Sequence, residues 1–483
     1  MNHRLFLTRV ILVVSSAALT LPAFGQQIRA PAVKTTSVTF ESKVKAGFGV
    51  ADITPSPGAD MPYGYTRRVG TGVHDRLLVN ACVVYDGTTP VALAGVDALF
   101  IDKETVQQAR RAIFEATKIP GQNVLIGVNH THTGGPIISG RASKADPAYV
   151  EKVVQAIASA VTDAWQSLHA AELGVGTGKE DAILFNRRFL MRDGREITHP
   201  GKPHSPHHDQ IVAPAGPIDP DVGVLAVRTP RGKVTGVIVN YACHNTTMSG
   251  DKFSPDYVGY LRRHLKASYG EQTSVVFLLG ACGDVTQVDN MSIGAQSGPE
   301  YANMFGAKLA AETVRTIGRM SWLKEASVAV AVENVLLPIR PEMDPERETP
   351  AFGHGTGQPE FWAAQRRLVA EERQRTPKID CEVQAIRIGP LALVTNGAEL
   401  FCEYGLRIKK ASELKPTWVV TLANEYIGYV CTPQAFVGGG YEPRTATSSK
   451  MGIESGQLLV ETSLTAITRI GPPRKSAQSQ VAK

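Results

Sequence analysis

Two histidines separated by one residue follow an apolar run in the segment NVLIGVNHTHTGGP, residues 123–136. Residues i and i+2 of a β-strand point to the same face, so we expect His130 and His132 to face one site. Neutral imidazole is the commonest metal ligand in proteins. A short His-x-His pattern is equally typical of a solvated strand end, so other motifs must decide between these interpretations.

Five apolar runs in the chain end in residues that can do chemistry. They are VLIGV before His130, VTGVIVNYAC before His244, SVVFLL before the segment ending in Asp284, LALVTNGA before Glu399, and WVVTLAN before Glu425. In α/β proteins, ligand sites assemble at the carboxyl ends of strands. We therefore predict that these strand ends contribute to one shared site.

His130, His244 and Glu399 are the candidate metal ligands among these residues. Two imidazoles and a carboxylate with one open position form a common catalytic zinc set, which lowers the pKa of bound water to about 7. Taken singly, His244 also fits a strand cap, and Glu399 fits the start of a helix. The prediction of a zinc ion, Zn2+, therefore depends on the presence of all three residues at strand ends.

The elements that must position these residues follow from the patterning along the chain. Alternating strand and helix patterns predict a mixed α/β (α+β) fold. Asp86-Gly87 predicts a hairpin, residues 103–118 an amphipathic helix, and Asp146-Pro147 the start of another helix. Proline-rich segments 198–220 and 339–361 are predicted to be loops that shape the rim of a cleft.

The first proline-rich segment also contains four histidines. These are His199, His204, His207 and His208. Their irregular spacing between prolines favours solvated side chains over a metal site.

The composition is typical of a globular protein, with 483 residues, 43% of them hydrophobic and 20% charged. Residues 1–25 resemble a signal peptide cleaved before Gln26, since their apolar core is too short to span a membrane. We therefore expect a secreted or periplasmic protein. The predicted organisation is a linker at 26–45, one catalytic domain at 46–470 and a polar tail at 471–483.

Charge and cysteine content exclude some functional classes. Loss of Arg4 and Arg9 with the signal peptide lowers the net charge from +6 to +4, which is too mild to indicate nucleic-acid binding. The sequence shows no basic amphipathic helix, so we expect at most peripheral membrane contact. Six cysteines without a CxxC pair do not form a disulfide scaffold, although one or two bridges remain open.

Several motifs, taken in order, resemble the catalytic domain of the neutral (non-lysosomal) ceramidases, zinc amidases that cleave the N-acyl bond of ceramide. The similarity runs from about Gly47 to the mid-450s. The matching segments are GFGVADITP with PYGY, GVHDRLLVNACVV, NHTHTGGP, LFNRR, NYACHNTTMSGDKFSPDYVGYL, GPLALVTNGAE and LANEYIGYVCTPQAFVGGGYEPRTATS. Each motif is weak by itself, whereas the ordered set is specific.

The resemblance implies a zinc site, a strand-end active site and a lipid-amide substrate. The implied zinc ligands are His130, His244, Glu399 and Tyr429. His132, Arg187 and Tyr441 would then face the scissile carbonyl, where a cation and hydrogen-bond donors stabilise the developing oxyanion. His132 would also move a proton to the leaving amine.

The chain departs from the family in two places. The family's Gly-Asp-Val-Ser-Pro motif reads GDVTQ at 283–287, so Thr286 replaces a serine proposed as a nucleophile. We favour a zinc-activated water as nucleophile. The serine would then not be essential, and its replacement by Thr286 would be compatible with activity. Family members usually add a β-sandwich domain, whereas this chain ends about forty residues after Tyr441.

Two alternatives to a zinc amidase remain open from the sequence. One is a non-catalytic binding protein that has kept the fold and lost the chemistry at Thr286. The other is a cysteine hydrolase that uses Cys243 or Cys282, although free cysteines are often simply buried.

Overall fold

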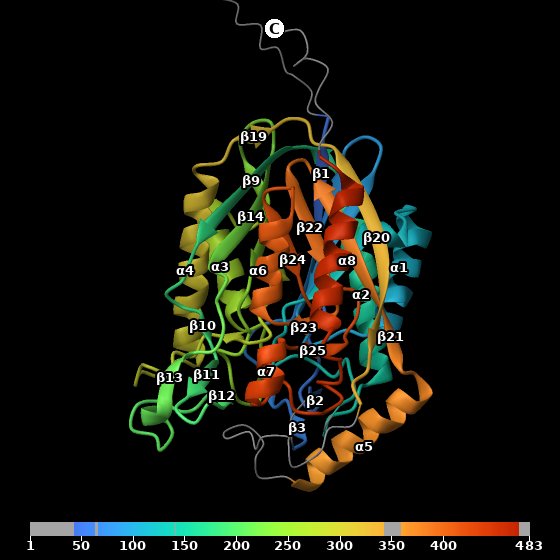
Figure 1. Cartoon of the computed structure of the whole chain (residues 1–483). Helices are drawn as coiled ribbons and strands as arrows, with labels where there is room; N and C mark the ends of the chain where they lie inside the picture. Colours follow the sequence, from blue (N-terminus) through green and yellow to red (C-terminus); the bar gives the residue numbers. More distant parts are fainter. Residues whose placement is uncertain (1–42, 63–65, 141, 342–358, 473–483) are drawn as a thin grey trace, which may run out of the picture. The chain divides into compact units, whose positions relative to one another are not determined.

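The computed structural model describes residues 43–62, 66–140, 142–341 and 359–472, which belong to one compact unit. Three sheets dominate it (Figure 1). The first has the order β7-β6-β5-β1-β8, with β1 Lys45–Asp52, β5 Leu78–Tyr85, β6 Pro90–Val96, β7 Val124–Val128 and β8 His169–Ala170. The predicted mixed α/β fold is confirmed.

The other two large sheets follow later in the chain. The second has the order β17-β15-β14-β9-β19, with β9 Glu172–Lys179, β14 Asp221–Arg228, β15 Val234–Tyr241, β17 Ser274–Leu279 and β19 Trp322–Leu323. The third has the order β20-β21-β22-β24, with β20 Val328–Pro338, β21 Lys378–Ile388, β22 Leu391–Thr395 and β24 Thr417–Val420.

The remaining strands are short and form separate sheets of two or three strands. They pair as β2 Asp60–Met61 with β3 Arg68–Val69, β4 Gly72–Val73 with β16 Lys252–Phe253, β10 Phe185–Asn186 with β18 Val285–Thr286, β11 Arg188–Met191 with β12 Glu196–Thr198 and β13 Ile211–Pro214, and β23 Ala398–Leu400 with β25 Gly428–Val430. The α-helices in the described residues are α1 Lys103–Thr117, α2 Pro147–Gln166, α3 Tyr257–Tyr269, α4 Pro299–Ile317, α5 Pro359–Arg375, α6 Cys402–Ala411, α7 Pro433–Gly438 and α8 Ser455–Ile470.

The three large sheets share an apolar core, and helices cover their other faces. Along β6, Leu93 belongs to a cluster that also contains Leu225 of the second sheet and Leu393 of the third. The neighbouring residue Ala94 packs instead with the buried residues of α1 and α2, as strand alternation requires. Helices α6 and α8 cover the third sheet in the same way (Figure 1).

Each large sheet contains one parallel strand pair whose crossover includes a helix. The pairs are β6–β7 around α1, β15–β17 around α3, and β22–β24 around α6. A parallel pair requires such a crossover, which places the carboxyl ends of both strands at one edge. Each of the three sheets therefore offers strand ends to a common site.

The local predictions are largely confirmed. A hairpin joins β5 to β6, with Asp86 accepting hydrogen bonds from the backbone and Gly87 at a φ of 92°. Asp102 caps α1, and Asp146 caps α2 ahead of Pro147.

The prediction that the first proline-rich segment is a loop is wrong. Residues 198–220 contain β13, which pairs with β11, and a short 3-10 helix at His208–Gln210, so this segment is not simply a loop. Most of 339–361 lies outside the described residues, as do 1–42 and 473–483. The predicted signal peptide, linker, domain limits and tail remain predictions. None of the described helices combines the length and apolarity needed to span a membrane.

Candidate metal centre

Three candidate ligands converge, each from a segment that follows a parallel strand of one of the three large sheets. His130 follows β7, His244 follows β15, and Glu399 lies in β23, which follows β22. Glu399 Oε2 lies 3.5 Å from His130 Nε2 and 3.6 Å from His244 Nε2. The three ligand atoms lie within 4.8 Å of one another, and all three residues are buried. The structure thus brings together the three residues selected from the sequence.

Backbone carbonyls fix the orientation of both imidazole rings. His130 Nδ1 lies 3.0 Å from the Leu99 carbonyl, and His244 Nδ1 lies 2.7 Å from that of Cys282. A carbonyl accepts only from a protonated Nδ1, so each Nε2 keeps its lone pair for a metal. Burial lowers the pKa of His130 to about 4 and that of His244 to about 3, so both rings are neutral near pH 7.

The carboxylate of Glu399 is satisfied on one side only. Its Oε1 accepts a hydrogen bond from the Tyr426 hydroxyl at 3.2 Å. Its Oε2 is buried and accepts no hydrogen bond from the described residues. A buried carboxylate oxygen without a hydrogen-bond partner destabilises a fold. Glu399 Oε2 is such an oxygen, and it lies between the two neutral imidazoles. Such a donor set fits a divalent cation, and zinc favours two imidazoles with a carboxylate.

His130 and His132 approach each other, but not by the mechanism predicted. Strand β7 ends at Val128, so strand alternation does not orient either ring. His130 instead has a φ of 64°, in the left-handed region, and its Nε2 lies 3.4 Å from Nε2 of His132. A non-glycine residue in that region is strained, and such strain persists where the surroundings enforce it.

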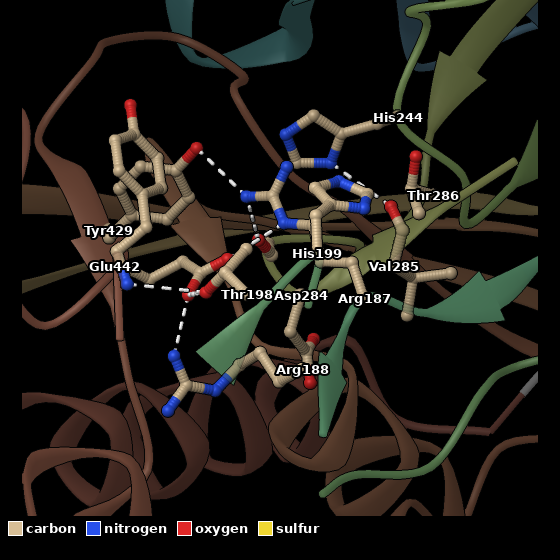
Figure 2. Close-up of polar contacts among 12 residues, drawn as sticks. Arg187, Arg188, Thr198, His199, His244, Asp284, Val285, Thr286, Tyr429 and Glu442 are labelled. Carbon is tan, nitrogen blue, oxygen red and sulfur yellow. Dashed lines mark hydrogen bonds and ion pairs between the residues drawn. The ribbon is translucent and has the colours of Figure 1, made fainter. Parts of the chain in front are cut away.

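Tyr429 lies beside Glu399 because the two residues pair in register between β25 and β23. Its hydroxyl accepts a hydrogen bond from Arg187 Nη2 at 3.1 Å (Figure 2). Burial and the nearby Glu399 raise the pKa of Tyr429 well above 10. The predicted phenol ligand therefore lies next to the centre and is protonated without a metal.

Arg187 is held by a buried ion pair that the sequence analysis did not identify. Its Nε donates to Glu442 at 2.7 Å, while Nη2 also donates to the Gly283 carbonyl at 2.7 Å. Glu442 is fully buried and also accepts from Arg188 and Thr198 (Figure 2). Burial alone would raise the pKa of Glu442, but the two arginines lower it to about 2. Burial lowers the pKa of Arg187, and Tyr429 and Glu442 more than offset this.

His132 connects the buried ligands to a cavity of about 480 Å³. The side chain is partly buried, and residues of β3 and of the segment after His244 line the same cavity. They include Arg68, Val69 and Met248. This volume lies within the range of small-molecule sites. His132 therefore lies between this cavity and the candidate ligand His130.

Tyr441 and Thr286 occupy different positions relative to the centre. The ring of Tyr441 lies 5.9 Å from the ring of Tyr429, centroid to centroid, so it is part of the same cluster. Thr286 is buried, and its hydroxyl donates to Gln287 at 2.9 Å. This hydrogen bond engages the hydroxyl that a covalent mechanism would need.

The alternative sites weighed from the sequence do not form in the described residues. The four histidines from His199 to His208 take part in no cluster of three metal-binding side chains within the described ranges. All six cysteines are free and buried. Burial raises the pKa of Cys243 and of Cys282 well above 9, which disfavours the thiolate that a cysteine hydrolase needs.

Two further residues support the site and were missed from sequence. The hydroxyl of Tyr426 contacts Glu399, and its ring stacks on Phe100. Glu442 follows Tyr441 directly, and no spacing signal distinguishes it from a surface carboxylate. Glu425, at the end of the fifth run, accepts from the Glu382 backbone and lies 3.8 Å from Lys103.

The fold and the site together define a mixed α/β protein with a candidate metal centre at the ends of parallel strands. No family model matches the chain. The neutral ceramidase of Pseudomonas aeruginosa is 24% identical over 472 residues, covering 82% of this chain and 68% of that protein. The resemblance predicted from the ordered motifs is thereby confirmed.

Solved structures show the same fold. A crystal structure of neutral ceramidase from Pseudomonas aeruginosa superposes with a TM-score of 0.66 at 20% identity, covering 90% of this chain and 76% of that one. A structure described as ceramidase complexed with C2 gives a TM-score of 0.65 at 18% identity, with the same coverage. The chain therefore has the fold of these ceramidases.

Proposed function

We propose that the protein is a zinc-dependent hydrolase of linear N-acyl amides, related in chemistry to ceramidases. The observation that carries this proposal is the convergence of His130, His244 and Glu399, with an unpartnered carboxylate oxygen between two neutral imidazoles. The similarity to neutral ceramidase supports an amide as the bond that is cleaved. The substrate is then a small lipid amide that yields an amine and a fatty acid.

His130, His244, Glu399 and Tyr429 would hold the metal. When bound, a zinc ion acts as a Lewis acid that polarises a carbonyl and activates water. Water activated in this way would make a covalent nucleophile from the chain unnecessary, and the hydroxyl of Thr286 already donates to Gln287.

Arg187 would stabilise negative charge on the substrate oxygen. Its Nε and Nη2 are occupied by Glu442, Gly283 and Tyr429, and within the described chain Nη1 has no protein partner. A guanidinium has five donors in a rigid fork, so Nη1 keeps two N–H groups for a substrate oxygen. Fixed donors at a developing oxyanion need no reorganisation during the reaction.

His132 would move a proton to the leaving amine. It lies beside His130 and lines the cavity, which puts its ring between the candidate centre and a bound amide. An imidazole can both donate and accept a proton, as a general acid and base requires. The ring of Tyr441 lies beside that of Tyr429.

A panel of fluorogenic N-acyl amides tests the proposal. The purified protein should hydrolyse at least one of them, and His244→Ala should abolish turnover. His264→Ala is the matched control, because His264 lies on α3 and contacts Asn303. If the purified protein carries metal but hydrolyses none of the amides, the alternative of a non-catalytic binding protein would be favoured.

We also propose that the protein is exported. The support is the signal-peptide pattern in residues 1–25, which lie outside the described residues. Amino-terminal sequencing of protein recovered from the extracellular or periplasmic fraction should begin at Gln26. A mature chain that begins at Met1 and stays in the cytoplasm would contradict export.

A further inference from the structure

The side chain of Asn129 spans the backbone of the candidate ligand His130. Asn129 is buried, and its Oδ1 accepts a hydrogen bond from the Thr131 backbone N–H at 3.2 Å. The residue enclosed by this bond, His130, has a φ of 64°. The left-handed conformation is unfavourable for a residue with a Cβ, so surrounding contacts must maintain it. The hydrogen bond from Thr131 to Asn129 is one such contact.

A buried ion pair determines which way the amide of Asn129 faces. Its Nδ2 donates to Asp97 Oδ1 at 2.7 Å. Arg262 Nη1 and Nη2 donate to the two oxygens of Asp97, at 2.6 and 2.8 Å, and both of these residues are buried. A carboxylate in such a pair accepts hydrogen bonds and does not donate them. The Nδ2 of Asn129 must therefore face Asp97, which leaves its Oδ1 for Thr131.

The backbone carbonyl of Pro255 joins the segments that carry the two candidate histidine ligands. It accepts a hydrogen bond from Asn129 Nδ2 at 3.3 Å and another from Asn245 Nδ2 at 3.0 Å. Asn129 directly precedes His130, and Asn245 directly follows His244. Both asparagines are buried. One backbone oxygen therefore links two ligands that are distant in sequence.

We propose that Asn129 is a positioning residue for the metal centre, an inference that rests on the proposed function. Asn129 acts through His130, because it holds that residue in the left-handed conformation and ties its segment to that of His244. Removal of a group that orients a metal ligand typically weakens metal binding by about tenfold to a hundredfold. The amide of Asn129 therefore contributes to zinc affinity without being a ligand.

Asn123 offers a matched control at the other end of the same strand. It directly precedes β7, whereas Asn129 directly follows it. Asn123 is also buried, and its Nδ2 donates to the Pro90 carbonyl at the start of β6, at 2.8 Å. Asn123→Ala and Asn129→Ala each remove a buried amide beside β7, but only Asn129 adjoins a candidate ligand.

Competition between the purified protein and a chromophoric chelator measures the zinc affinity. Asn129→Ala should bind zinc about tenfold or more weakly than the wild type, and Asn123→Ala should keep the wild-type affinity. The visible absorption of cobalt, bound in place of zinc, reports the ligand geometry. This spectrum should change in Asn129→Ala and remain that of the wild type in Asn123→Ala.

A double variant tests whether Asn129 acts through His130. In a protein that already carries His130→Ala, the further change Asn129→Ala should cause no additional loss of zinc affinity, because the ligand that Asn129 positions is absent. Fully additive losses would mean that Asn129 acts independently of His130, and they would overturn the proposal.

Asn129→Ser keeps the inference testable if Asn129→Ala does not fold. Serine retains an oxygen that can accept from the Thr131 backbone, and it is too short to replace the amide between Asp97 and Pro255. Its zinc affinity should lie between those of the wild type and Asn129→Ala. Wild-type affinity in the folded variants at position 129 would overturn this inference and leave the proposed function standing. A wild-type protein that binds no zinc would overturn both.

Discussion

Arg187 donates a hydrogen bond from Nη2 to the hydroxyl oxygen of Tyr429, over 3.1 Å. This contact joins the predicted oxyanion donor to the predicted phenol ligand, so a single buried cluster contains both functions. Glu442 fixes the other side of the guanidinium. The orientation of Arg187 towards the candidate centre therefore depends on a carboxylate that is not itself a candidate metal ligand.

Glu442→Gln should destabilise the fold by about 3 kcal/mol near pH 7, because it leaves the buried Arg187 without its counter-charge and Arg188 with Glu196 alone. The pKa of Glu442 in the folded protein, about 2, lies below its ordinary value of 4.5. Its contribution is therefore fully present above pH 4.5 and is lost as the pH falls towards 2.

Chemical denaturation across this pH range measures the effect. The difference in the free energy of unfolding between wild type and Glu442→Gln should shrink as the pH falls from 4.5. Glu196→Gln is the control, because Glu196 pairs with Arg188 at the edge of the same cluster and is partly exposed. An equal loss in both variants, independent of pH, would argue against the role given to Glu442.

Thr286→Ala should retain turnover within about tenfold, whereas Arg187→Ala should lose roughly a hundredfold or more. The reason is that Thr286 donates its hydroxyl to Gln287, while Arg187 keeps donors for the substrate oxygen. Arg187→Lys separates charge from geometry, since it keeps the cation and loses the planar fork. Steady-state kcat/KM values provide the comparison, and the reverse ranking would support a covalent mechanism.

Tyr426→Phe should weaken zinc binding about tenfold, because the hydroxyl that orients Glu399 is removed. The ring should keep its place, since it stacks on Phe100 with centroids 3.7 Å apart. Competition with a chelator measures the affinity. Tyr404→Phe is the matched control, as its hydroxyl contacts the Cys431 carbonyl instead. Equal zinc affinities in the two variants would remove Tyr426 from the site.

Dispersed, shorter-chain or more polar N-acyl amides should be cleaved better than long-chain ceramide in vesicles. The cavity beside His132 has the volume of an ordinary small-molecule site, about 480 Å³, and the sequence shows no basic amphipathic helix to dock on a bilayer. A chain-length series of kcat/KM values and vesicle co-sedimentation provide the measurements. Best activity on long-chain ceramide in intact vesicles would contradict this expectation.

The strand ends were predictable because a buried strand leaves a strong local pattern. Apolar runs before His130, His244 and Glu399 indicated where strands stop, and parallel pairing brings such ends to one edge. The orientation of the side chains at these strand ends could not be predicted from the same patterns. The approach of His130 to His132 depends on one left-handed residue after the strand, which strand alternation does not encode.

The buried polar partners could not be predicted, because their roles depend on contacts distant in sequence. Glu442 pairs with Arg187 across 255 positions, and no local pattern marks an acidic residue for complete burial. Residues 198–220 were predicted as a loop from their prolines, yet β13 pairs with β11 because tertiary contacts override that composition.

The metal content of the purified protein tests the central claim most directly. Elemental analysis should find about one zinc per chain in the wild type and in His264→Ala, and His130→Ala and His244→Ala should each lose most of it. The three remaining ligands of the proposed set would hold the ion poorly. Full zinc occupancy in both His130→Ala and His244→Ala would contradict the assignment of this centre.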